Sequence, residues 1–177
     1  MASEDYFKLF GLPAQFAINS ETLDATWRQL AARVHPDRFA TAGAAERRVA
    51  MQWASTINDA YRILKSPISR ARYLCERAGC DLQTESNTRM DGAFLMLQME
   101  WREQLDDARQ AGSAAQAQEL VQSILSSRQQ LESLVAGLID EKHDYEAAAA
   151  KVREWMFIEK LLAESQSLRN ELLDRQH

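Results

Sequence analysis

The fold is decided first by residues 20–37, which read SETLDATWRQLAARVHPD. Apolar side chains recur in this stretch at spacings of four, three and four residues, the period of one buried helix stripe: Leu23, Trp27, Leu30 and Val34. Ser20 is a favourable N-cap, so we expect the helix to begin there. It must end near His35, because Pro36 disfavours the α conformation in the residue before it.

A second, longer helix is predicted after a polar loop that runs from Pro36 to about Gly43. One face of this helix is expected to be buried, and it carries Val49, Trp53, Ile57, Tyr61 or Ala60, and Leu64. Pro67 ends the helix, and a short helix through Tyr73 follows. Residues 6–10 form another short apolar element. We therefore expect an antiparallel helical hairpin braced by small helices.

The composition of the whole chain also favours helices. The 177 residues include 27 Ala and 20 Leu, against 18 Val, Ile and Thr together, and only 9 Gly and Pro. Strands prefer β-branched residues, and turn-rich β folds need glycine and proline. The sequence therefore predicts an all-α protein.

Three further helices are predicted in the second half of the chain. The first runs from about Thr88, which forms a capping box with Asp91, to Gln110. The second follows a capping box of Ser113 and Gln116 and continues to about Val135 or beyond. The third runs over residues 144–173. The connections are short, so the sequence predicts an antiparallel three-helix bundle.

The two halves differ in charge, which suggests two domains with different partners. Residues 1–78 carry 11 basic and 8 acidic side chains, a net charge of +3, whereas residues 79–177 carry 10 and 18, a net charge of −8. Residues 79–87 are a polar stretch between helical patterns. We therefore predict an N-terminal domain over residues 1–78, a linker over 79–87 and the bundle over 88–177.

Several classes of protein are excluded or disfavoured by the sequence. No apolar run approaches the roughly 20 residues of a membrane-spanning helix, and the acidic N-terminus does not resemble a signal peptide. The basic excess is too sparse for a nucleic-acid footprint. Cys75 and Cys80 lack the partners of a zinc site, so no metal or cofactor is expected. We predict a buried Cys75 and a loop Cys80, no membrane or nucleic-acid partner, and a reducing, cytoplasmic compartment.

The tripeptide His35-Pro36-Asp37 lies where the hairpin turns. Taken alone it is a weak signal, since a helix stop also uses proline and aspartate there. Its setting is more informative, because basic side chains flank it: Arg28, Arg33 and Arg38. Such a loop offers an imidazole and a carboxylate to a partner, with positive charge for steering. Arg47 and Arg48 are either solvated charges or more of the same surface, and the sequence does not separate the two.

The first half resembles the J-domain family in order and spacing. The matching segments are YFKLFGL at 6–12, WRQL at 27–30, HPDRF at 35–39 and INDAYRIL at 57–64, and the Ser66-Pro67 pair with Arg70, Arg72 and Tyr73 also fits. The resemblance implies that the domain docks on a DnaK-class chaperone and stimulates its ATP hydrolysis. It implies that residues 35–37 are the essential loop, and that Arg28 and Arg33 meet the chaperone. Gln29 and Ala32 are uncharged, so the helix face has fewer basic residues than in general J proteins. Val34 stands where the family usually has an aromatic residue before the tripeptide. Both departures favour a specialised chaperone as the partner.

The first bundle helix carries more apolar residues than one buried stripe needs. At about 100° per residue, Phe94, Leu97, Trp101 and Leu105 share one face, whereas Leu95, Met99 and Met96 fall on the other side. Charged residues share that second side: Glu100, Arg102 and Glu103. An apolar centre with a charged rim is typical of an interface, although such residues also cover domain junctions. Met156 and Phe157 would extend this patch if the first and third bundle helices are neighbours.

A J domain followed by an acidic helical bundle resembles the HscB family of iron–sulfur co-chaperones. The string DGAFLMLQMEWREQLD at 91–106 matches the bundle signature of that family, and AAAAKV at 147–152 and FIEKL at 157–161 match its later helix. The resemblance implies that the bundle binds an IscU-type iron–sulfur scaffold. The matching positions are Leu95, Met96, Met99, Glu100, Arg102, Glu103 and Phe157.

The leading hypothesis is an adaptor without catalysis of its own, which presents the scaffold to an HscA/DnaK-class ATPase chaperone. One alternative is a general J-domain co-chaperone with a broader client range. Another is an enzyme that uses His35 with Asp37 or a cysteine, but the sequence has no nucleophile elbow, glycine-rich phosphate loop or paired metal-ligand motif. Self-association through the surplus apolar patch is left open.

Overall fold

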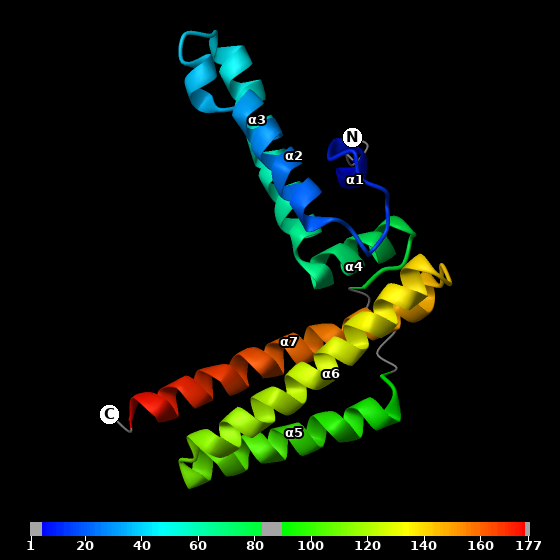
Figure 1. The fold of residues 1–177 in the computed structure, drawn as a ribbon, viewed down its shortest axis with the longest axis vertical. Helices are drawn as coiled ribbons and strands as arrows, with labels where there is room; N and C mark the ends of the chain where they lie inside the picture. Colours follow the sequence, from blue (N-terminus) through cyan, green and yellow to red (C-terminus); the bar gives the residue numbers. More distant parts are fainter. Residues whose placement is uncertain (1–4, 83–89, 176–177) are drawn as a thin grey trace.

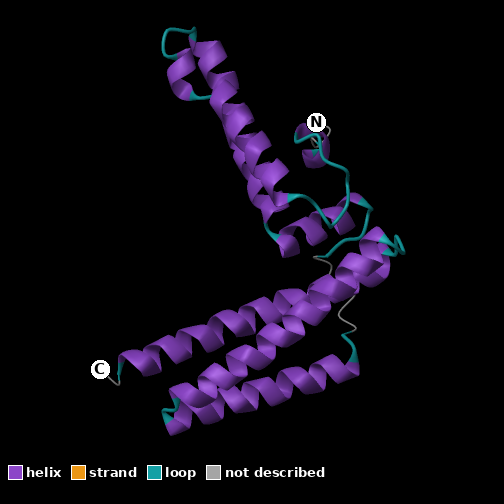
Figure 2. Cartoon of the chain, viewed as in Figure 1, coloured by secondary structure: helices purple, strands orange, loops and turns teal. Residues whose placement is uncertain are grey.

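The computed structural model describes residues 5–82 and 90–175, and within those ranges it contains helices and no strands (Figure 2). The first part comprises α1 (Tyr6–Leu9), α2 (Ser20–Arg33), the 3₁₀ helix η1 (Pro36–Phe39), α3 (Ala44–Lys65) and α4 (Pro67–Arg77). The second part comprises α5 (Gly92–Ala111), α6 (Ala114–Asp140) and α7 (Tyr145–Asp174). The all-α prediction is confirmed.

Helices α2 and α3 form the predicted antiparallel hairpin (Figure 1). The cap of α2 differs from expectation, because the side chain of Asn19, rather than Ser20, accepts the backbone N–H of Thr22 at 2.8 Å. Across the hairpin, the Trp27 ring stacks on Tyr61 with centroids 4.8 Å apart. The Asp24 carboxylate of α2 pairs with Lys65 of α3 at 2.7 Å and accepts from the Tyr61 hydroxyl at 3.0 Å, and these contacts hold the register of the two helices.

The expected burial of Val49 and Trp53 is wrong. Their side chains are 50% and 39% exposed, whereas Ile57, Ala60 and Leu64 on the same stripe are buried. Helix α1 packs on α3, and at the tip of the hairpin α3 also packs on the four-residue η1. Neither short helix covers Val49 and Trp53, so this part of the stripe stays in contact with water.

The three long helices of the second part form the predicted antiparallel bundle (Figure 1). The predicted cap at Ser113 is confirmed, because its hydroxyl accepts from the backbone N–H of Gln116. Helix α7 begins close to the predicted position and is capped by Asp144. Helix α5 is capped by Asp91, whose carboxylate accepts from Ala93 N–H at 3.1 Å. Thr88 and most of the predicted 79–87 linker lie outside the described residues.

The two parts are joined by a buried junction in which α4 packs on α6 and α7. The loop between α1 and α2 is held from both sides of this junction. The Asp140 carboxylate at the end of α6 accepts from the backbone N–H groups of Phe16 and Ala17, at 2.6 and 2.8 Å. The Phe16 ring lies 6.4 Å, centroid to centroid, from that of Trp155 on α7. These contacts tie the orientation of the hairpin to that of the bundle.

Arg70 on α4 is the buried cation of the junction. Its Nε atom donates to Phe16 O at 2.7 Å, and its Nη1 atom donates to Leu64 O at 2.6 Å. Burial lowers the pKa of the guanidinium, and the negative charges of Glu132 and Asp140 oppose that shift. A buried charge is tolerated only when it is paired or hydrogen-bonded, and Arg70 meets that condition.

We expect Arg70→Met to lower the free energy of unfolding by about 2–4 kcal/mol, because two buried carbonyls lose their donor. Urea unfolding followed by circular dichroism measures the change. Arg72→Met is the matched control on the same helix, since Arg72 pairs with Glu76 at a partly exposed i,i+4 position. That control should lose no more than about 0.5 kcal/mol. Equal losses in the two variants would show that Arg70 has no special role in the junction.

Candidate functional site

The tip loop, residues 35–37, projects from the end of the hairpin that lies farthest from the bundle (Figure 1). Helix α2 ends at Arg33, and His35 has extended backbone angles of φ −59° and ψ 133°, as a residue before proline prefers. Pro36 then opens η1, where its fixed φ is favourable and its missing N–H costs no hydrogen bond. The sequence Val-His-Pro-Asp thus ends one helix and turns the chain within a few residues.

The two polar side chains of the tip loop face solvent. The side chain of His35 is 58% exposed and that of Asp37 is 90% exposed. The Nδ1 atom of His35 lies 3.4 Å from the Asp37 backbone nitrogen and 3.5 Å from the Asp37 carboxylate. Both distances are long for hydrogen bonds. The two contacts also exclude each other, because Nδ1 must lack a proton to accept from the backbone N–H and must carry one to donate to the carboxylate. The loop therefore presents an imidazole and a carboxylate that are free to engage a partner.

Three exposed arginines surround the tip loop, as the sequence indicated: Arg28, Arg33 and Arg38. The guanidinium of Arg38 donates to the Ala32 carbonyl at 3.5 Å. Within residues 5–82 and 90–175, none of the three forms an ion pair with a carboxylate. Their positive charge is therefore available to an acidic surface on a partner.

A second exposed surface lies on α5 and α7, and we call it the bundle patch. Its apolar members are Leu95, Met96, Met99 and Phe157, with exposed fractions of 45%, 73%, 71% and 42%. Phe94, Trp101 and Leu105 of the same α5 helix are buried. The predicted division of α5 into a core face and a surplus apolar face is confirmed.

Phe157 joins the patch because α5 and α7 pack against each other. A narrow cleft between these helices is lined by both Arg102 and Phe157, above the buried Trp101. The Nε2 atom of Gln98, in the same cleft, is buried and has no hydrogen-bond partner. The charged members of the patch are all exposed, namely Glu100, Arg102 and Glu103. Apolar side chains thus sit beside charges of both signs, which is the composition of a specific protein interface.

Met156 does not extend the bundle patch. It lines a different groove, together with Pro67 and Ile68 at the start of α4. Adjacent helical residues differ in direction by about 100°, so Met156 faces the junction when Phe157 faces the patch. The suggestion that both residues enlarge the patch is therefore wrong for Met156.

The two cysteines lie near the junction and are both buried. Cys80 is in the loop after α4, where its backbone N–H donates to the Cys75 carbonyl. Burial raises the pKa of the Cys75 thiol from 9.0 to about 12, and it also raises the pKa of Cys80. In the part of the chain that the structure describes, no cluster of His, Cys, Asp and Glu could hold a metal ion.

We expect Cys75 to resist alkylation by iodoacetamide at pH 8 in the folded protein. Only the thiolate reacts, and a pKa of about 12 instead of 9.0 lowers its population about 1,000-fold at that pH. The alkylation rate should keep rising with pH up to the raised pKa, because the population of the reactive thiolate rises with pH until the thiol is fully deprotonated. Mass spectrometry of native and urea-unfolded samples measures both rates. Similar rates in the two samples would contradict the buried environment.

Comparisons with known proteins place the chain in a family. The chain is 62% identical over 166 residues to the "Co-chaperone protein HscB homolog" of Bordetella avium, covering 93% of this chain and 96% of that protein. The homologue of an Azoarcus species is 45% identical over 158 residues, covering 89% of each chain. This chain belongs to the HscB co-chaperone family.

Solved HscB structures agree with that assignment. The Vibrio cholerae chaperone HscB superimposes with a TM-score of 0.82 at 35% identity, covering 96% of this chain and 99% of that one. Human HscB gives a TM-score of 0.87 at 25% identity, covering 94% and 82%. Residues 90–166 match the family model described as the HSCB C-terminal oligomerisation domain. Along the described residues, no helix is both long and apolar enough to cross a membrane.

Proposed function

We propose that this HscB-family protein is a bivalent adaptor in bacterial iron–sulfur cluster assembly. Its bundle patch binds an IscU-type scaffold, and its tip loop engages an HscA/DnaK-class chaperone in the cytoplasm and stimulates ATP hydrolysis. The observation that carries the proposal is the presence of two exposed, chemically distinct surfaces on separate parts of one joined molecule, the tip loop on the hairpin and the bundle patch on α5 and α7. Family membership supports both partners.

The tip loop would act on the chaperone by binding one conformation of the chaperone more tightly than the other. A ligand shifts a conformational equilibrium only through a difference in affinity for the two states. The solvent-facing imidazole of His35 and carboxylate of Asp37 would supply that difference, and the surrounding arginines would speed the encounter. The protein itself would carry out no catalysis.

The bundle patch would act by raising the local concentration of scaffold. When one adaptor holds the scaffold and also reaches the chaperone, their encounter becomes effectively intramolecular. The junction formed by Arg70, Asp140 and Phe16 supports this geometry, because it fixes the two surfaces relative to each other. A fixed geometry avoids the ordering cost that a flexible linker would add.

The test is steady-state ATP turnover by an HscA-type chaperone with this protein, with an IscU-type scaffold, and with both. We expect stimulation by each alone and a rate with both that exceeds the product of the two separate stimulations. DnaK in place of the HscA-type chaperone measures partner specificity. An ATP turnover that does not change when scaffold is added would favour the alternative, a general J-domain co-chaperone. The absence of stimulation with either chaperone would overturn the proposal.

Self-association is a second candidate role for the bundle patch, favoured by the description of the matched family model as an oligomerisation domain. Sedimentation equilibrium over a range of protein concentrations separates the two roles. A stable dimer that dissociates when scaffold is added would mean that the two partners compete for one surface. A monomer that forms a one-to-one complex with scaffold supports the adaptor.

A further inference from the structure

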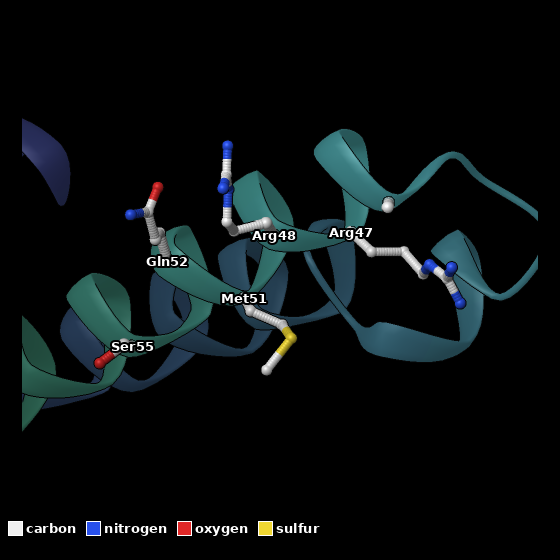
Figure 3. A pocket seen from close by; sticks show the side chains of 6 residues that line it. Arg47, Arg48, Met51, Gln52 and Ser55 are labelled. Carbon is white, nitrogen blue, oxygen red and sulfur yellow. The ribbon is translucent and has the colours of Figure 1, made fainter.

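The outer face of α3 is an exposed surface that neither the tip loop nor the bundle patch includes. Six residues line one shallow depression on it (Figure 3), namely Ala44, Arg47, Arg48, Met51, Gln52 and Ser55. They belong to the first three turns of the helix. At about 100° per residue they spread over one side of α3, opposite to the buried Ile57 and Ala60. This surface is called the outer α3 face below.

Met51 lies at the centre of the outer α3 face and is 66% exposed. In Figure 3, Arg48 and Gln52 leave the helix on one side of it and Arg47 on the other. Long unbranched side chains such as methionine adapt to irregular apolar recesses on a partner. An apolar group between two cations is typical of a contact with an acidic surface that has an apolar recess.

The arginines of this face are free of carboxylate partners. Neither Arg47 nor Arg48 forms an ion pair within residues 5–82 and 90–175. Residues 28–55 contain five arginines against only Asp37 and Glu46, a net charge of +3 on the outer half of the hairpin. The complementary partner is therefore acidic.

The first turns of α3 lie near the tip loop, because α3 packs on η1, which carries Pro36 and Asp37. Helix α2 offers only Arg28 and Arg33, with uncharged Gln29 and Ala32 on the same exposed side. Helix α3 adds two more cations in its first turns, Arg47 and Arg48. The positive charge near the loop is thus shared between the two helices of the hairpin.

We propose that the outer α3 face is a second contact for the chaperone that the tip loop engages, and that it selects a chaperone with an acidic surface and an apolar recess for Met51. The inference rests on the proposed function and deepens it. The loop supplies the signal for hydrolysis, and this face supplies affinity and partner choice. The two roles predict different kinetic effects.

The test is a titration of an HscA-type chaperone with full-length protein at saturating ATP. For Arg47→Ala/Arg48→Ala we expect the half-maximal concentration to rise roughly fivefold to tenfold, with an unchanged maximal rate. Met51→Gln should raise it roughly threefold or more. Raising the salt from about 50 to about 300 mM should shrink the effect of the arginine variant, because salt screens surface charges. Lys8→Ala is the control, another exposed cation, on α1, whose loss should change the half-maximal concentration less than twofold.

Two outcomes would overturn the inference while the proposed function stands. One is a half-maximal concentration for the arginine variant that equals that of Lys8→Ala, while His35→Gln is inactive. The other is a lower maximal rate of the arginine variant with an unchanged half-maximal concentration. The second outcome would assign the arginines to the action of the loop rather than to docking. A wild-type protein that stimulates no chaperone would instead overturn the proposed function. Unchanged thermal melting of the variants, expected because these side chains are exposed, confirms that each one is folded.

Discussion

His35→Gln is expected to lower the maximal stimulation of chaperone ATP turnover roughly tenfold to hundredfold, a size typical of coupling between two sites. The imidazole stands 58% exposed at the tip of the hairpin, and no buried contact depends on it. Glutamine keeps hydrogen-bonding atoms and polarity but places them differently and cannot carry a positive charge. The loss should therefore lie in the action of the loop on the chaperone and not in the fold.

His143→Asn is the matched control for that variant. His143 lies after α6, at a positive φ of 52°, and its Nδ1 atom is 3.0 Å from the Ile139 carbonyl. Asparagine tolerates this backbone conformation, and the position belongs to neither proposed surface. Stimulation should remain within twofold of wild type in the control. Full stimulation of ATP turnover by His35→Gln, with the same melting temperature as wild type, would show that the tip loop does not act on the chaperone.

The sequence predicted the elements whose signals are local. The stop at Pro36, the cap at Ser113 and the hairpin stripe at Leu23 all depend on residues within a few positions of each other, and the structure contains each of them. The N-cap of α2 was missed by one residue because Asn19 and Ser20 are both good caps. Sequence pattern alone does not decide which of two adjacent caps takes the position.

Long-range contacts account for what the sequence did not predict. Asp140 and Phe16 are 124 residues apart, and no local pattern marks either as part of a junction. Trp53 follows the period of the buried stripe, yet it is 39% exposed. Burial depends on which element covers a stripe, and the period of a helix only says which residues share a face.

The candidate surfaces were predicted unequally for the same reason. Leu95, Met96 and Met99 could be separated from the core of α5 by helix geometry alone, since one helix carried too many apolar residues for one face. Placing Phe157 beside them required knowing that α5 and α7 are neighbours. The sequence shows the doubled arginine at 47 and 48, but only the structure shows that Met51 lies on the same surface.

The bundle patch leads to the other large expected effect. Leu95→Ala/Met99→Ala/Phe157→Ala should weaken binding of an IscU-type scaffold at least about 100-fold, because apolar anchors at the centre of an interface carry most of its affinity. These three side chains are 45%, 71% and 42% exposed, so their truncation should cost the fold less than about 1 kcal/mol. Isothermal titration calorimetry measures the binding, and urea unfolding measures the stability.

Leu134→Ala/Leu173→Ala is the matched control, because these leucines are 45% and 44% exposed on α6 and α7. It truncates two exposed apolar side chains outside the patch and should leave scaffold affinity within about threefold of wild type. In the patch variant, chaperone stimulation without scaffold should persist, since the tip loop is intact, whereas the synergy with scaffold should vanish. Retained synergy would contradict a scaffold site at the patch and would favour the general J-domain co-chaperone. Loss of both activities would instead mean that the bundle patch and the tip loop are not independent sites.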